Sequence, residues 1–302
     1  MRRFPARPLT LVLVFLLAAC AGEAQQQAAS GFDSTRAYTH LREMVLMGPR
    51  PAGSPGAARN RAYILEELKR YGIAAVEQPF VAETPLGRVS MVNIIATLPG
   101  TRPERIAFGT HYDTKLFREF RFVGANDGAS STAAVLELAR VLKDRPRPFT
   151  LEFIFFDGEE AVVEWREGDH TYGSRHYVAA AQKAGTLASL KAFILLDMIG
   201  DRNLNIMRES YSTRWLTDLI WAAAHRIGHG QYFLAQTTPI EDDHIPFLKA
   251  GVPAVDIIDL DYPAWHTAGD TLDKVSARSL QIVGDVVLAA LPDIEARLIK
   301  TP

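Results

Sequence analysis

Short apolar runs alternate with amphipathic stretches along most of the chain. The apolar runs suit buried strands, and the stretches between them repeat apolar residues with the spacing of a helix. This alternation predicts an α/β sandwich with a largely parallel central sheet. The expected strands are 92–98, 105–110, 151–156, 193–199 and 252–258, and the expected helices are 131–142, 174–184, 213–227 and 280–298.

Two more helices are expected near the start of the folded part. Asp33 and Ser34 can cap the first helix through their side-chain oxygens. The second helix is expected to stop at Gly72, because glycine readily adopts the backbone conformation that ends a helix. Between the two helices, segment 48–56 is rich in glycine and proline and is expected to be an irregular loop.

The first twenty residues have the features of an export signal. Arg2, Arg3 and Arg7 supply positive charge, and the apolar run 9–19 is too short to be a comfortable membrane span. The run ends in Leu-Ala-Ala-Cys, which resembles a bacterial lipobox, so Cys20 is expected to carry a lipid and to begin the mature protein. The alternative is an ordinary secretory signal with an unrelated cysteine.

Cys20 is the only cysteine, so no internal disulfide can form and no thiol remains for catalysis or metal binding. Segment 21–32 is rich in glutamine and alanine and is expected to be a flexible tether, which leaves 33–302 as a single folded domain after the signal at 1–20. Gly22 stands where an aspartate would signal inner-membrane retention. We therefore expect an exported lipoprotein on the periplasmic face of a membrane, with the outer membrane favoured where one exists.

Composition and charge exclude several classes of protein. The chain has 302 residues, 48% of them hydrophobic, and a formal net charge of −2. Apolar residues are too plentiful for a disordered chain, and the near-neutral charge gives no reason to expect a nucleic acid as partner. Membrane contact is expected only through the lipid.

Polar side chains that can hold a metal ion follow several of the expected strands. In such sheets ligands collect at the carboxyl ends of the strands, and acidic groups there are costly to bury unless they are paired or bind a metal. Oxygen and imidazole ligands without a thiolate suit zinc in an open catalytic site. The groups are His111, Asp113, Asp127, Glu159, Glu160, Asp197, the stretch 241–244 and His266.

Each of these groups has an ordinary structural interpretation when it is considered alone. His111 could be a satisfied buried histidine, although Asp113 could orient a ligating imidazole. Asp127 could merely cap the following helix, and the pair Glu159 and Glu160 could be a solvated turn. The combination, in this order along the chain, is what indicates a metal site.

The same residues resemble the zinc aminopeptidase superfamily and, within it, the glutaminyl cyclases, over about 33–298. The resemblance implies a three-layer sandwich with a mostly parallel, mixed central sheet. The features shared with the superfamily are His111, Asp113, Asp127, Glu159, Glu160, Asp197 and His266. The features typical of cyclases are 122–127, 155–161 with Trp165, 172–176, 241–247 and 265–267.

The resemblance implies a zinc ion held by Asp127, Glu160 and His266, with the fourth position left for substrate or water. One zinc ion is expected on this basis. His111 and Asp197 could hold a second metal, with Asp127 as the bridge. Ligand identity alone leaves both metal counts open.

The resemblance also implies roles for residues beside the metal. Glu159 matches the family's proton shuttle, and Asp197 and Asp242 match the acidic partners near it. A zinc ion can polarise the γ-carbonyl of glutamine, and Glu159 could move a proton from the attacking amine to the departing ammonia. The residues expected to line the glutamine pocket are Trp165, Trp265 and Tyr262.

The function implied is cyclisation of an N-terminal glutamine of a peptide or protein to pyroglutamate with release of ammonia. The main alternative is a two-zinc aminopeptidase, because every position for a second metal is present. A non-catalytic binding module on a peptidase fold is a third interpretation, since fold does not determine function. Such a module should have lost ligands or the proton shuttle, and none is missing here.

The chain departs from the animal cyclases at several positions. Asp256 stands where those enzymes carry a histidine, their cysteine pair near the first motif is absent, and segment 261–265 looks one residue shorter. None of these changes touches the implied zinc ligands. Asp256 and Asp259 could form a bacterial variant of the hydrogen-bond network near the pocket.

Overall fold

The computed structural model of the protein describes residues 30–300, and its centre is a six-stranded sheet. The strand order is β1-β2-β4-β3-β5-β8. Strands β3, β4, β5 and β8 run parallel, and β1 and β2 form an antiparallel hairpin that pairs through β2 with β4. The strands are β1 (Ala74–Thr84), β2 (Gly87–Leu98), β3 (Arg102–His111), β4 (Phe149–Phe156), β5 (Leu190–Asp197) and β8 (Ala254–Ile258).

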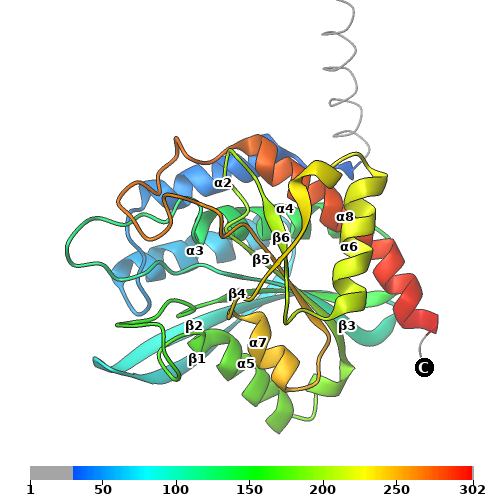
Figure 1. The fold of residues 1–302 in the computed structure, drawn as a ribbon. Coiled ribbons are helices and arrows are strands. Elements are labelled where there is room, and N and C mark those ends of the chain that lie inside the picture. The colour runs from blue at the N-terminus through cyan, green and yellow to red at the C-terminus, as the bar shows by residue number, and fades with distance from the viewer. Residues whose placement is uncertain (1–29, 301–302) are drawn as a thin grey trace, which may run out of the picture.

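Helices cover both faces of this sheet. The helices form a larger layer on one side of it and a smaller layer on the other, as Figure 1 shows. The larger layer is α2 (Ser34–Leu46), α3 (Pro55–Arg70), α4 (Ala129–Leu142), α6 (Arg214–Arg226) and α8 (Ala277–Lys300). The smaller layer is α5 (Tyr172–Lys183) and α7 (His244–Lys249). The predicted three-layer sandwich with a mixed, mostly parallel sheet is confirmed.

The core lies on both sides of the sheet, because successive residues of a strand point to opposite faces. In β4, Phe153 packs in the apolar cluster beneath the larger helical layer, and its neighbour Ile154 packs in the cluster against α5 and α7. On that second face the rings of Phe193 and Phe247 stack with centroids 3.8 Å apart. Burial on both faces explains why the parallel strands are mainly apolar along the sequence and do not alternate between apolar and polar residues.

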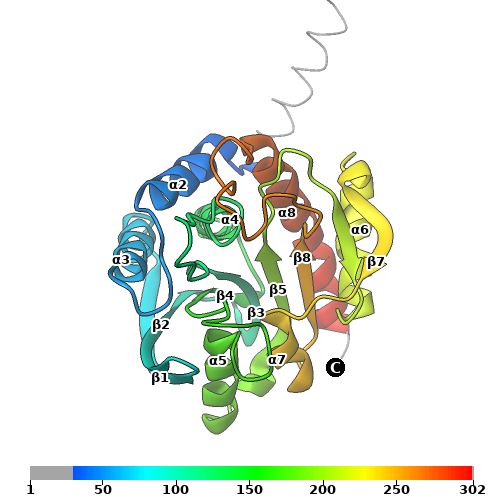
Figure 2. The ribbon, with the colours of Figure 1, turned by 60° about the vertical axis from the view of Figure 1, so that its left-hand side comes forward.

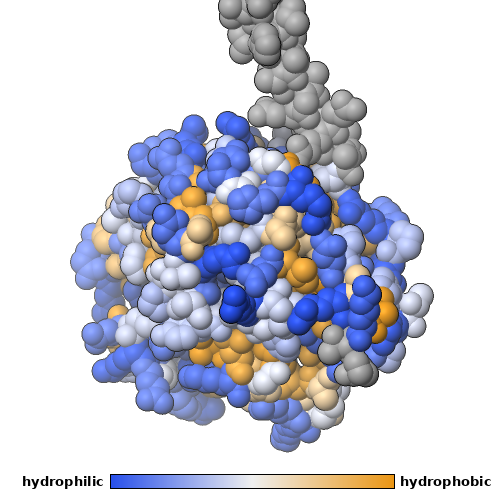
Figure 3. Space-filling view, turned by 45° about the vertical axis from the view of Figure 1, so that its right-hand side comes forward, coloured by the Kyte–Doolittle hydropathy of each residue, from blue (hydrophilic) through white to orange (hydrophobic). Residues whose placement is uncertain are grey.

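A second, two-stranded parallel sheet lies beside β8 on the flank of the molecule. It consists of β6 (Ile206–Glu209) and β7 (Phe233–Thr238), which Figure 2 shows next to α6. Two short 3₁₀ turns, Leu187–Ser189 and Gly230–Tyr232, precede β5 and β7. The face in Figure 3 is mainly hydrophilic, and its apolar side chains gather chiefly in a patch across the lower middle.

The predicted helix ends near the amino terminus are confirmed. The Asp33 side chain accepts a hydrogen bond from the Arg36 backbone N–H at 3.0 Å, which caps α2. Gly72 follows α3 with φ 71°, the left-handed conformation that glycine adopts without strain.

The predicted signal and lipid attachment, and most of the predicted tether, fall within residues 1–29. These residues lie outside the described part, so all three stay predictions. Within residues 30–300, no helix has both the length and the apolar character needed to cross a membrane.

Candidate active site

The site lies at the carboxyl ends of the parallel strands, where the topology brings distant segments together. His111 is the last residue of β3, and Asp197 is the last residue of β5. Glu159 and Glu160 lie in the loop that follows β4, and Asp127 lies just before α4. His266 joins them from the loop between β8 and α8.

Asp127, Glu160 and His266 form a first trio of side chains. The Nε2 atom of His266 lies 3.3 Å from Asp127 Oδ2 and 3.2 Å from Glu160 Oε1. The three offer ligand atoms that all lie within 4.8 Å of one another. These are the three residues that the sequence predicted as zinc ligands, and the structure brings them together.

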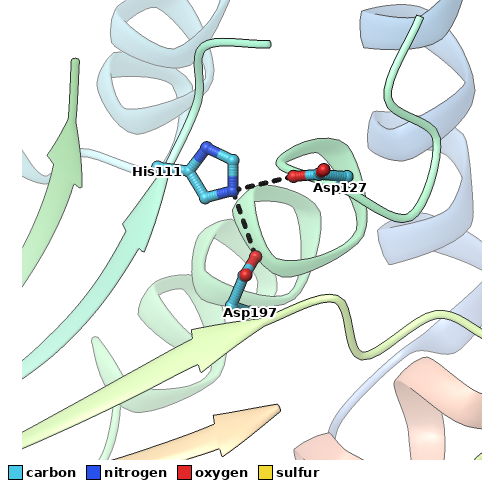
Figure 4. A group of neighbouring side chains, drawn as sticks. All are labelled: His111, Asp127 and Asp197. Carbon is cyan, nitrogen blue, oxygen red and sulfur yellow. Dashed lines mark hydrogen bonds and ion pairs between the residues drawn. The ribbon is translucent and has the colours of Figure 1, made fainter. Parts of the chain in front are cut away.

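His111, Asp127 and Asp197 form a second trio, which Figure 4 shows. The Nε2 atom of His111 lies 3.3 Å from Asp127 Oδ1 and 3.1 Å from Asp197 Oδ1. Asp127 therefore offers one oxygen to each trio. These are the residues that the sequence predicted for a second metal.

The donor set of each trio fits a metal ion. In both trios one imidazole nitrogen faces two carboxylate oxygens, and a single N–H cannot serve two acceptors well. A cation between these atoms would satisfy all of them, and nitrogen and oxygen ligands without sulfur suit zinc. The part of the chain described by the structure thus contains a buried metal-binding group.

The protonation of the first trio points the same way. Burial alone would lower the pKa of His266, but hydrogen bonds to Asp127 and Glu160 outweigh it and raise the pKa to about 9. Burial and the nearby Asp127 carboxylate raise the pKa of Glu160 to about 7. Among these protein groups alone, protons are held between the ligand atoms. A metal ion competes with protons for such ligands.

The backbone around Asp127 is unusual and tightly packed. Gly128, and not Asp127, is the N-cap residue of α4, so the capping interpretation of Asp127 is wrong. Gly128 has φ 86°, and a Cβ atom there would lie 2.7 Å from the carbonyl oxygen of Asp113. Glycine is therefore needed at this position for the loop to place Asp127 beside the histidines.

Asp270 holds this loop from the other side of the site. Its carboxylate accepts hydrogen bonds from the backbone N–H groups of Asn126 at 2.8 Å and Asp127 at 3.1 Å, and from the Tyr262 hydroxyl at 2.7 Å. The sequence interpretation missed this residue. Its position four residues after His266 was the available signal.

Asp270→Asn is expected to weaken metal binding by about 10- to 100-fold, the usual effect of removing a group that orients ligands. Asparagine keeps the size but replaces one acceptor oxygen with an NH₂ group, which would face a backbone N–H. The measurement is the metal dissociation constant, by chelator competition at fixed pH. The matched control is Asp273→Asn, an exposed acid in the same segment, and equal constants for both variants would contradict the role of Asp270.

Asp113 aligns the groups on the opposite side of the site. Its two oxygens accept hydrogen bonds from the backbone N–H groups of Glu159 at 3.2 Å and Glu160 at 3.4 Å. One of them also lies 3.5 Å from His111 Nδ1. The backbone N–H of Lys115 donates to Glu160 Oε1 at 3.0 Å. The carboxylate of Glu160 is thus oriented by neighbours in the loop that follows β3.

Glu159 is buried beside the two trios without belonging to either. Burial, reinforced by Asp242 and Glu160, raises its pKa well above the usual range, although His111 opposes the shift. Its Oε2 atom lies 3.9 Å from His111 Nδ1. Asp242 is also buried, and burial together with Asp197 raises its pKa well above the usual range. The predicted acidic residues are therefore close enough to interact.

Asp256 and Asp259 do not form a joint network. Asp256 is fully buried without a hydrogen bond to either side-chain oxygen in the described part of the chain, and its Oδ2 atom lies 3.8 Å from His244 Nδ1. Asp259 instead accepts hydrogen bonds from the backbone of Asn205 and Asp261. The two residues belong to different surroundings.

A cavity of about 290 Å³ opens above these groups. Trp165 and Trp265, which were predicted to line the glutamine pocket, both line this cavity. Trp265 stacks on His266 of the first trio with ring centroids 4.3 Å apart, and Trp165 stacks on His170 with centroids 4.2 Å apart. The charged groups that line the cavity are Lys115, Asp127, Glu159, Glu160, Asp197, Glu241, Asp242 and His266.

Tyr262 does not belong to the cavity lining, which corrects the sequence prediction. It is only 5% exposed and packs with Met198, Ile240 and Ile258, behind the apolar part of the wall. Its hydroxyl is held by Asp270. Tyr262 therefore supports the wall and does not face a substrate.

Three non-glycine residues around the site have positive φ angles. They are Thr171 at 49°, Met198 at 49° and His266 at 52°. Met198 follows Asp197 directly, and its backbone N–H donates to Asp197 Oδ1 at 2.8 Å. Such conformations are uncommon for residues with a side chain, and they concentrate at functional sites.

Comparisons with known proteins agree with this geometry. Residues 93–291 match the model of peptidase family M28. The chain is 35% identical over 263 residues to a glutaminyl-peptide cyclotransferase-like protein of Mus musculus, covering 77% of this chain and 68% of that protein.

Solved structures give the same result. The crystal structure of an Acidobacteriales bacterium glutaminyl cyclase matches with a TM-score of 0.85 and 42% identity, over 88% of this chain and 96% of that one. A leucine aminopeptidase precursor from Bacteroides thetaiotaomicron matches with a TM-score of 0.79 and 28% identity, over 86% and 96%. The family match spans more than half of the chain, and the resemblance noted in the sequence is confirmed. The chain belongs to peptidase family M28 and, within it, to the glutaminyl cyclases.

Proposed function

We propose that this enzyme cyclises the N-terminal glutamine of peptides and proteins to pyroglutamate and releases ammonia, with zinc as its metal. The observation that carries the proposal is the position of Glu159. It is a buried carboxyl beside the first trio, and it lines a cavity walled by two tryptophans. Glu159 as proton carrier and a zinc ion held by the first trio would thus face the same small cavity.

The size of the cavity supports a single residue as its occupant. Its volume of about 290 Å³ is at the lower end of the range for small-molecule sites, about 300–1,000 Å³. Trp165 and Trp265 would restrain a glutamine side chain and keep water away from it. Restraint favours attack by the substrate's own amine, because a tethered nucleophile needs only the right conformation.

The reaction requires one proton to move. The α-amine attacks the carbon of the γ-amide, a C–N bond forms, and the bond to the amide nitrogen breaks. Glu159 would accept the proton that the amine loses and deliver it to the departing nitrogen, which leaves as ammonia. Asp242 and Asp197, as nearby carboxyls, would keep Glu159 able to hold that proton. A zinc ion held by Asp127, Glu160 and His266 would supply polarisation of the γ-carbonyl.

A second candidate function is hydrolysis of N-terminal residues by a two-metal aminopeptidase. The second trio favours it, because His111 and Asp197 are positioned to share Asp127 with the first trio. Two metals near each other can activate water. The solved structure of a leucine aminopeptidase precursor from Bacteroides thetaiotaomicron has the same overall fold.

One experiment separates the two functions. The purified protein is incubated with two peptides that differ only in their first residue, glutamine or leucine. Loss of one ammonia from the glutamine peptide, with the leucine peptide intact, is the expected result in mass spectrometry. Release of a free amino acid from either peptide would contradict cyclisation. Metal analysis of the same sample is expected to find about one zinc per chain, whereas two would fit a peptidase.

We also propose that the enzyme is anchored by a lipid on Cys20 and acts outside the cytoplasm on exported peptides and proteins. The support is the basic, apolar and Leu-Ala-Ala-Cys sequence of residues 1–20. The test is membrane association in a bacterial host, which Cys20→Ser should abolish. A variant that stays on the membrane would exclude the lipid anchor.

A further inference from the structure

The catalytic cavity has a second hollow beside it. This hollow has a volume of about 480 Å³ and lies between the loop after β4 and the first turns of α5 and α7. Glu241 lines both the hollow and the catalytic cavity. The two spaces therefore meet at this side chain.

The wall between the two spaces is a pair of stacked rings. Trp165 faces the catalytic cavity, His170 faces the hollow, and the rings stack with centroids 4.2 Å apart and an interplanar angle of 16°. Burial, together with Arg175, lowers the pKa of His170, while Glu241 opposes that shift. His170 is therefore mainly neutral at neutral pH and does not neutralise Glu241.

The loop that carries this wall is held in one shape by Asp169. Its buried carboxylate accepts hydrogen bonds from three consecutive backbone N–H groups at 2.9–3.0 Å and from the Tyr172 hydroxyl at 2.7 Å. The hollow is thus bounded by an ordered loop. The three donors are Val162, Val163 and Glu164.

Glu241 is the charge at the junction that is open to a partner. It is exposed, and within residues 30–300 its carboxylate makes no hydrogen bond or ion pair. Arg175, which also lines the hollow, donates to the carbonyl oxygens of Thr171 and Gly168 and lies over the Tyr172 ring. Lys249 and Glu167 line the hollow but not the catalytic cavity.

A peptide that leaves the catalytic cavity through the hollow passes Glu241, which lines both spaces. If glutamine fills the cavity, its own carbonyl leads to the second residue, which lies one step of about 3.3–3.6 Å along an extended chain. The side chain of the second substrate residue therefore lies at the mouth of the cavity. Glu241 is the charged residue that lines both the cavity and the hollow there. A carboxylate there attracts a lysine or arginine side chain and repels an acidic one.

We propose that the hollow beside Glu241 binds the residues that follow the N-terminal glutamine, and that Glu241 favours lysine or arginine as the second residue. This inference rests on the proposed cyclase function. It assigns a substrate class to the enzyme, namely peptides that begin with glutamine followed by a basic residue.

The test uses three peptides that begin Gln-Lys, Gln-Ala and Gln-Glu and are otherwise identical. At low salt the kcat/KM for Gln-Lys is expected to exceed that for Gln-Glu by about fivefold, the upper range for an exposed ion pair. The difference should lie mainly in KM. It should shrink in 1 M salt, where the screening length falls to about 3 Å.

Two variants locate the effect. Glu241→Gln is expected to bring the Gln-Lys to Gln-Glu ratio close to one, and Glu241→Lys to reverse the preference. The control is Glu83→Gln, which removes one negative charge from the exposed end of β1 and should keep the parent ratio. A ratio that survives in Glu241→Gln would overturn the role of Glu241.

The outcomes separate this inference from the proposed function. Equal ammonia release from all three peptides would overturn the inference and leave cyclisation intact. No ammonia from any of them would contradict the cyclase function and the inference together.

Discussion

Replacing Glu159 with glutamine is expected to lower kcat for glutamine cyclisation by about 10²- to 10⁴-fold, the usual contribution of a general acid–base group. Glutamine has nearly the same shape but cannot accept and return a proton. The backbone N–H that Glu159 donates to Asp113 is kept in the variant. Glu159 belongs to neither trio, so the metal should remain bound.

Two measurements are needed for this variant. Turnover of a Gln-initiated peptide gives kcat, and metal analysis of the same sample shows whether the ligands are intact. The matched control is Glu164→Gln, an exposed acid in the same loop that does not line the catalytic cavity and should keep parent turnover. Activity within a few-fold of the parent in Glu159→Gln would remove Glu159 from the proton transfer.

Arg50→Met is expected to cost about 4 kcal/mol of unfolding free energy, because several buried carbonyl groups would lose a charged donor at once. Arg50 is fully buried, and burial lowers its pKa only to about 10, so it remains charged at neutral pH. Its guanidinium joins the end of α2 to the residue that follows β3 and to the loop before Asp127. The five acceptors are the carbonyl oxygens of Met44, Gly48, Tyr112, Val123 and Gly124, at 3.3, 3.2, 3.4, 2.7 and 3.1 Å.

Thermal unfolding measures this effect. The loss corresponds to a fall in Tm on the order of 10 °C for a chain of this size. Arg50→Lys, which keeps the charge but reaches fewer acceptors, should fall between the parent and Arg50→Met. The control is Arg59→Met, an exposed arginine on α3, which should change stability by less than about 0.5 kcal/mol. Equal Tm values for Arg50→Met and Arg59→Met would refute the bracing role.

The strands at the centre of the sheet could be predicted because both of their faces are buried. Segments 105–110 and 151–156 are mainly apolar, and they form β3 and β4 with a few added residues. Strand β1 was missed because most of its positions are exposed or half-buried, and its pairing with β2 defines it. Helix α7 was missed because it has six residues and contains Pro246.

The metal-binding residues could be predicted because their order along the chain resembles that of the zinc aminopeptidase superfamily, and two of them, His111 and Asp197, end apolar strands. The residues that hold the metal-binding loops in place could not be predicted from the sequence. Asp270 contacts Asn126 across 144 positions of sequence, and Arg50 contacts Gly124 across 74. Such hydrogen bonds to backbone atoms leave no local pattern. Tyr262 was assigned wrongly for the related reason that a position in the sequence does not determine which way a side chain points.

The left-handed backbone at Thr171, Met198 and His266 limits how stable this protein can become. Each such residue costs roughly 1–2 kcal/mol relative to an ordinary conformation, a sizeable fraction of the 5–15 kcal/mol that keeps a typical domain folded. Selection for thermal endurance alone would favour glycine or asparagine at all three positions. At His266 that exchange would remove an imidazole of the first trio. The sequence that would be most stable in this fold therefore differs from the sequence that can bind the metal, and the difference lies at His266.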